Sequence, residues 1–182
     1  MYPKGEIMRQ LFLSEPSSNY KQSFKNYTLD YKVASEDSYY FKKYSKALVD
    51  FSGFLHHLIH EADGNNLPNG RVASSTFWLI DQNEVVGVVR IRHQEVMFAG
   101  HIGYDVSPKH RKRGYGTQIL KLALAEAQKL GITKAVVTCR TDNEPSKRII
   151  EKNGGKFLGI IYDKEEDEEL FKYVIDTNDC GI

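Results

Sequence analysis

The sequence has few of the features that mark secreted, membrane-spanning or nucleic-acid-binding proteins. Only two cysteines occur, Cys139 and Cys180, and they lie far apart without metal-ligand spacing. A disulfide framework is therefore not expected, and the reducing cytoplasm is the expected location. No apolar run approaches the ~18 residues of a membrane span, and the first residues lack a signal-peptide core. The formal net charge of +1 gives no general attraction to nucleic acid or to an anionic membrane.

The composition is that of a globular protein. Hydrophobic residues make up 41% of the 182 residues and charged residues 27%, which is typical of a chain with a full-sized core. No internal repeat or low-complexity linker interrupts the sequence. We therefore expect one domain over residues 1–182.

Two stripes of aromatic and aliphatic residues follow a short apolar run at residues 7–13, which we expect to form a strand. The members of the stripes recur at helical spacing: Tyr20, Phe24, Tyr27 and Tyr31, then Tyr40, Tyr44, Leu48, Phe51, Leu55 and Ile59. The polar residues 35–38 separate them, so two amphipathic helices are predicted. Stripes of this period favour core packing over the lining of a substrate pocket.

Histidines gather late in the second predicted helix. His56 and His60 lie four residues apart and share a helix face, as two zinc ligands would, and His57 and Glu61 lie beside them. A catalytic zinc site needs at least one more ligand and an open position, and no third ligand is identifiable. We therefore expect no metal here and interpret the segment as a solvated helix end.

From residue 74 onward the hydrophobic period becomes that of strands. The expected strands are 75–80, 85–92, 101–106, 135–140, 156–162 and 170–176, and the expected helices are 114–130 and one that begins after Asn143. The strand–helix–strand unit at 101–140 requires a parallel crossover. The predicted fold class is therefore α/β (α+β), with the order βααβββαβαββ and a mixed, mostly antiparallel central sheet that carries helices on both faces.

Basic residues stand directly before two glycines at the junction of the third strand and the long helix. The stretch reads Asp105-Val106-Ser107-Pro108-Lys109-His110-Arg111-Lys112-Arg113-Gly114-Tyr115-Gly116-Thr117. Glycine permits close approach to the backbone, and a helix N-terminus offers free N–H groups and positive potential. Together with Arg and Lys these groups favour a phosphate site. Neither a Walker A loop nor a dinucleotide fingerprint fits, because Gly-Lys-Ser/Thr is missing and position 119 is Ile.

The spacing Arg111-x-x-Gly114-x-Gly116 resembles the acetyl-CoA signature Arg/Gln-x-x-Gly-x-Gly/Ala of the GNAT superfamily of N-acetyltransferases. A second family-like motif, Asn143-x-x-Ser146, lies downstream in the right order. The predicted element order is also that of the GNAT fold. The resemblance covers roughly residues 75–175, and the first seventy residues fit by pattern only.

The resemblance implies an enzyme that moves the acetyl group of acetyl-CoA to a primary amine by direct attack in a ternary complex. Acetyl-CoA, the co-substrate, would lie where the strands 101–106 and 135–140 splay apart, with a backbone N–H near Val106 polarising the thioester. The implied cofactor-binding residues are Val106, Arg111, Lys112, Arg113, Gly114, Tyr115, Gly116, Thr117, Asn143 and Ser146. Residues 1–72 would cover the acceptor site, and residues 73–182 would form the acetyl-CoA core and a C-terminal hairpin.

The sequence departs from the family at the general acid. Many members carry a tyrosine seven residues after the motif asparagine, and here that residue is Ile150. The candidates for the proton transfer are Tyr104 and His101. Tyr104 shares a strand face with Val106, whereas His101 points to the other face unless a bulge intervenes, so we favour Tyr104. A wall aromatic at Tyr104 and a non-catalytic His101 remain the alternatives.

Two further functions remain open at this point. A non-catalytic acetyl-CoA sensor or interaction module would explain Ile150, and a general α/β binding domain would require two correctly ordered motifs to be accidental. We expect the enzyme, acting on a small-molecule or peptide amine, as a monomer or homodimer.

Overall fold

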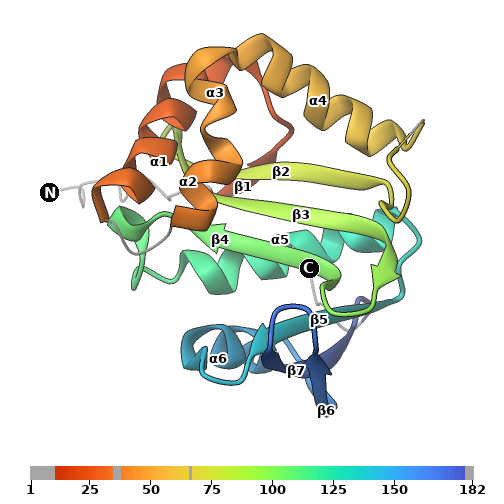
Figure 1. Ribbon diagram of the computed structural model, residues 1–182. Helices are drawn as coiled ribbons and strands as arrows, with labels where there is room; N and C mark the ends of the chain where they lie inside the picture. Colours follow the sequence, from red (N-terminus) through yellow and green to blue (C-terminus); the bar gives the residue numbers. More distant parts are fainter. Residues whose placement is uncertain (1–10, 35–37, 66, 179–182) are drawn as a thin grey trace, which may run out of the picture.

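The computed structural model describes residues 11–34, 38–65 and 67–178, which form two antiparallel sheets with helices around them (Figure 1). The first sheet has the order β1-β2-β3-β4 and the second the order β5-β7-β6. The strands are β1 (Phe12–Ser14), β2 (Ser74–Asp81), β3 (Glu84–Val96), β4 (Gly100–Val106), β5 (Lys134–Arg140), β6 (Lys156–Asp163) and β7 (Glu168–Asp176). The α-helices are α1 (Lys21–Ala34), α2 (Ser38–Tyr44), α3 (Lys46–Val49), α4 (Phe51–Asp63), α5 (Tyr115–Lys129) and α6 (Glu144–Lys152).

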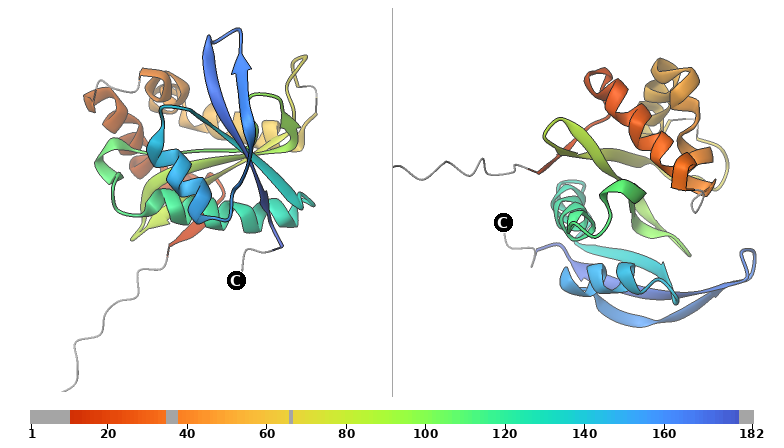
Figure 2. Two further views of the ribbon diagram at one scale, coloured as in Figure 1. Left: turned by 90° about the horizontal axis from the view of Figure 1, so that it is seen from below. Right: turned by 90° about the vertical axis from the view of Figure 1, so that its left-hand side faces the viewer.

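Two hydrophobic cores lie on opposite faces of the first sheet. Helices α1 to α4 cover one face, where aromatic side chains from α1 and α4 surround the fully buried Trp78 of β2. Helix α5 covers the other face and packs between the two sheets (Figure 2). The aromatic stripes of the N-terminal helices are thus mainly core, as their period predicts. None of the helices in the described part of the chain is long and apolar enough to span a bilayer.

The predicted fold class is confirmed, and two of its details differ. The second N-terminal helix is divided into α2, α3 and α4. At the second of these breaks the carboxylate of Asp50 accepts the Gly53 N–H at 2.9 Å and starts α4. The expected first strand begins only at Phe12, and residues 7–10 of that prediction lie outside the described residues.

The expected mixed sheet is split between β4 and β5, which form no ladder with each other. The strands approach closely at one end, where a Cβ added to Gly100 would lie 2.5 Å from the Val136 carbonyl oxygen. There the His101 Nδ1 accepts the Val136 N–H at 3.0 Å. Farther along, toward Tyr104 and Cys139, a cavity lies between the strands. A side chain therefore joins the two sheets at the point where they separate.

A buried carboxylate ties the N-terminal helices to the end of β4. Asp105 accepts hydrogen bonds from Tyr44 at 2.6 Å, from Tyr31 at 2.7 Å and from Tyr27. Burial raises the pKa of the Asp105 carboxyl, while the nearby Lys43 ammonium and the three hydroxyl donors act in the opposite direction. The cluster fixes α1 and α2 over the strand that leads into the glycine loop.

We predict that Tyr44→Phe lowers the free energy of unfolding by about 1.5–3 kcal/mol, the usual net value of a hydrogen bond to a charged group. The Tyr44 hydroxyl is the tyrosine donor to Asp105 Oδ1, whereas Oδ2 has two tyrosine donors. Tyr20→Phe is the matched control, because the Tyr20 hydroxyl makes no hydrogen bond within the described residues. Urea unfolding measures both, and equal stabilities for the two variants would contradict the role assigned to the cluster.

Candidate active site

The glycine loop forms the N-terminus of α5, as the sequence predicts. Gly114 precedes the helix with φ +83°, a left-handed conformation that favours glycine, and a Cβ added there would meet nothing within 4 Å. The three preceding basic residues, Arg111, Lys112 and Arg113, are exposed. Open backbone, helix N-terminus and exposed cations thus coincide, which is a suitable arrangement for a diphosphate.

Three other residues of the glycine loop, Arg111, Tyr115 and Gly116, also make contacts that stabilise the fold. A Cβ at Gly116 would lie 2.6 Å from Ile149 Cδ1, so this glycine permits close packing of α5 on α6. The Tyr115 hydroxyl is buried and donates to Asp81 Oδ2. The Arg111 Nε donates to the Val106 carbonyl at 3.2 Å, which joins the loop to the end of β4. Tyr115 and Gly116 can therefore offer a ligand their backbone only.

A cavity of about 230 Å³ opens between β4 and β5 and brings several predicted residues together. Tyr104, Asn143 and Ser146 line it, and the Tyr104 and Ser146 hydroxyls lie 3.0 Å apart. The Asn143 Oδ1 accepts the Ser146 N–H at 3.1 Å and so caps α6, a structural role that does not prevent contact with a ligand. Burial raises the pKa of the Tyr104 phenol, and the Ser146 hydrogen bond offsets part of that effect.

Tyr104 and Val106 lie on the same face of β4, as the parity of the strand predicts. The register with β3 is regular from Ile102 to Val106, and both side chains pack against the core beneath α5. His101 lies outside this regular segment and lines neither of the two cavities described here. Burial lowers its pKa, which suits a neutral ring that accepts the Val136 N–H. The structure thus separates the two catalytic candidates.

Ile150, at the position of the family's tyrosine, is fully buried in the core beneath α5. Its Cγ2 occupies the space beside Gly155, where an added Cβ would lie only 2.5 Å away. Cys139 lines the cavity next to Ser146, and burial raises the pKa of its thiol to about 11. Cys180 lies outside the described residues.

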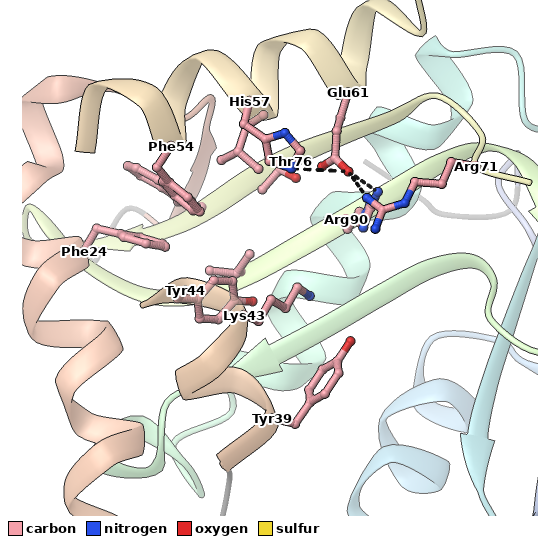
Figure 3. A pocket seen from close by; sticks show the side chains of 13 residues that line it. Phe24, Tyr39, Lys43, Tyr44, Phe54, His57, Glu61, Arg71, Thr76 and Arg90 are labelled. Carbon is pink, nitrogen blue, oxygen red and sulfur yellow. Dashed lines mark hydrogen bonds and ion pairs between the residues drawn. The ribbon is translucent and has the colours of Figure 1, made fainter. Parts of the chain in front are cut away.

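A second cavity, of about 250 Å³, lies on the helical side of the first sheet. Figure 3 shows an aromatic end and a charged end. At the charged end the buried Glu61 carboxylate contacts Arg90 at 3.0 Å, Arg71 at 3.2 Å and His57 at 3.8 Å. The two cavities share the lining residues Tyr39, Lys43 and Arg90, so they adjoin.

Sequence reasoning missed the charged residues of these cavities. Arg90 and Arg92 alternate with apolar residues along β3, a pattern that places two cations on one sheet face and that could have drawn attention to them. His56 and His60 are exposed, and no group of three or more potential ligands in the described segments could hold a metal ion.

Comparison with known proteins identifies the family. A family model described as an acetyltransferase (GNAT) domain matches residues 62–156, more than half of the chain. The ribosomal-protein-serine acetyltransferase of Escherichia coli (strain K12) is 26% identical over 125 residues, which are 63% of this chain and 68% of that protein.

Solved structures share the fold. The microcin C7 self-immunity acetyltransferase MccE, in complex with acetyl-CoA and AMP, has a TM-score of 0.67 at 15% identity and covers 96% of this chain and 97% of its own. The spermidine N-acetyltransferase of Vibrio cholerae, in complex with CoA and spermine, has a TM-score of 0.66 at 15% identity, with coverages of 94% and 98%.

The glycine loop, the cavity between the split strands and the family match agree with one another. The chain belongs to the GNAT acetyltransferase family, and it is an acyltransferase that moves the acetyl group of acetyl-CoA to a primary amine.

Proposed function

We propose that acetyl-CoA lies in the cavity between β4 and β5, and that the amine attacks it directly from the adjoining cavity in a ternary complex. The observation that carries this proposal is the Tyr104–Ser146 hydroxyl pair, which lies between the separated strands. The exposed cations and open backbone of the residues 111–117 support a diphosphate site at the end of the same strand. No covalent enzyme intermediate is required, since positioning alone supplies much of such catalysis.

Each residue of this site has a proposed task. A backbone N–H near Val106 polarises the thioester carbonyl, and the side chains of Asn143 and Ser146 face the pantetheine arm. The amine nitrogen forms a bond to the carbonyl carbon, and the carbon–sulfur bond breaks. Tyr104, hydrogen-bonded to Ser146, gives its proton to the departing thiolate, while the proton released by the amine passes to water. His101 joins the sheets and takes no part in the chemistry.

The acceptor is proposed to be a small-molecule or peptide amine that enters beneath the N-terminal helices. The cavity lined by α1, α2 and α4 supports this division, in which residues 1–72 cover the acceptor and residues 73–182 hold the cofactor. Related proteins differ in the groups that their names associate with them, from a ribosomal-protein serine to spermidine. The fold therefore does not determine the acceptor class, which depends on the side chains that line the cavity.

We predict that Gly114→Asp abolishes most acetyl-CoA binding, because it places a negative charge against the proposed diphosphate. Gly131→Asp is a matched control at the other end of α5, with φ +81° compared with +83° at Gly114 and equally open space. Both substitutions carry a similar conformational cost. Calorimetry should show an affinity loss of at least about tenfold for Gly114→Asp only. Equal affinities in the two variants would refute the diphosphate site.

We predict that Tyr104→Phe lowers kcat by at least about tenfold while acetyl-CoA affinity changes by no more than a few-fold, because general-acid assistance is lost and the ring remains. Free-thiol release with an amine panel measures kcat. The raised pKa of Tyr104 keeps the phenol protonated beyond its usual value of about 10, so the donor persists through mildly alkaline pH.

His101→Ala provides the comparison for this prediction. It should lower thermal stability by removing the link to Val136 and should leave kcat largely intact below the unfolding temperature. Normal turnover in Tyr104→Phe together with lost turnover in folded His101→Ala would reverse the assignment.

A further inference from the structure

The two adjoining cavities carry more positive than negative charge. Their linings, within the described residues, contain two carboxyl groups, Glu61 and Asp105, and four basic side chains: Lys43, Arg71, Arg90 and Arg92. His57 adds a further cation when it is protonated. The net charge of the whole chain is only +1, so this excess is a local property.

The carboxylates are already engaged. Glu61 binds Arg71 and Arg90 together, and this cluster connects α4 to the sheet. Asp105 is enclosed by the hydroxyls of Tyr27, Tyr31 and Tyr44. A cationic acceptor would therefore find no carboxylate in these walls that lacks partners.

Two of the basic side chains, Lys43 and Arg92, do not contact Glu61. The Lys43 ammonium lies 5.3–6.0 Å from the ring centres of Tyr39, Tyr40 and Tyr44 and makes no ion pair with a carboxylate in the described segments. Protein atoms surround it although its surface is open to the cavities, and this loss of hydration lowers its pKa. The Arg92 Nη1 donates to the Ala99 carbonyl, which is uncharged.

The cavity walls also contain more hydrogen-bond donors than acceptors among their buried atoms without partners. The Arg90 Nε and the Trp78 Nε1 are buried in these walls and have no acceptor within the described part of the chain. Both groups are donors. The walls thus combine unpaired donors with surplus positive charge, and an oxyanion in the cavity supplies the negative charge that is missing.

We propose that the acceptor is an amine that also carries an oxyanion, a carboxylate or a phosphate. Lys43 and Arg90, which line both cavities, bind this oxyanion where the cavities adjoin, and Arg92 faces it from the cavity between β4 and β5. This inference rests on the proposed function. The aromatic end of the cavity, with Phe24 and Phe54, holds an apolar part of the same molecule. At about 250 Å³ the cavity is smaller than the usual site for a drug-sized ligand, so the acceptor, or the end of it that enters, is small.

The same charges assist the reaction. A cation near a bound ammonium disfavours the charged form and lowers its pKa. The oxyanion provides the binding energy, and the surplus cations raise the fraction of free amine that can attack. A polyamine without an anion would meet repulsion in the same place.

The experiment compares acceptors that differ only in the anion. Phenylalanine is paired with phenylalaninamide, and phosphoethanolamine with ethanolamine, with spermidine as the polyamine; free-thiol release gives kcat/KM. We expect the anionic member of at least one pair to be preferred by about tenfold or more, the scale of one charge-assisted hydrogen bond. The pair that responds identifies carboxylate or phosphate. The amide has the less basic amine, so that bias works against the expected preference.

Variants at two neighbouring positions of α2 test the role of Lys43. Lys43→Gln should reduce the preference for the anionic acceptor by about tenfold, and Lys43→Glu should favour spermidine instead. Lys42→Gln, the exposed neighbour that lines neither cavity, should behave as the wild type. Unchanged acetyl-CoA affinity by calorimetry in all three variants shows that the effect belongs to the acceptor.

Binding separates this inference from the proposed function. Calorimetry of phenylalanine, phenylalaninamide and the phosphate pair, with CoA present, reports the anion preference even if no amine is acetylated. Acetylation that prefers spermidine or the neutral amines overturns the oxyanion site and leaves the acetyltransferase intact. If none of these amines releases thiol, the binding preference alone decides the oxyanion site, and the comparison of Gly114→Asp with Gly131→Asp decides the proposed function.

Discussion

The contact between Asp105 and the three tyrosines fixes the N-terminal helices over the end of β4, and the positions of both cavities depend on it. A carboxylate buried at the end of β4 would be costly without donors, and α1 and α2 supply them. Ser107, two residues farther on, donates to Asp30 of α1 at 3.0 Å. The N-terminal helices are thus attached on both sides of Val106. The cavity beneath these helices therefore depends on the same strand that leads to the glycine loop.

The separation of β4 from β5 gives the cavity between them its location. Close approach at Gly100 and the His101–Val136 hydrogen bond hold the strands together at one end. Beyond that point the side chains of Tyr104 and Cys139 face a cavity instead of a neighbouring ladder. His101, a candidate for proton transfer in the sequence analysis, thus holds the two sheets together beside this cavity.

Local patterns made much of the fold and of the cofactor loop predictable. The position of Gly114 before α5 follows from glycine spacing and helix periodicity, and the shared face of Tyr104 and Val106 follows from strand alternation. The division of the second helix was not predicted, because the hydrophobic period of the sequence continues across both breaks.

The charged residues that line the two cavities were harder to predict from the sequence than the helix division. Glu61 and Arg90 are separated by 29 residues, and Lys43 joins them only after α2 packs over the sheet. Charge balance within a cavity is a property of tertiary arrangement, so it appears only when the elements are assembled. From the sequence we interpret the segment with His57 and Glu61 as a solvated helix end. This is wrong for Glu61, which is buried in an ion-pair cluster.

The burial of Ile150 beside Gly155 restricts which side chains position 150 can hold. A tyrosine at position 150 would force a larger ring into a filled core, because Ile150 already lies tightly against Gly155. A tyrosine at position 150 and the present packing are therefore mutually exclusive. A chain with that tyrosine would need compensating changes around Gly155, so the volume of the core restricts residue 150 independently of any proton transfer.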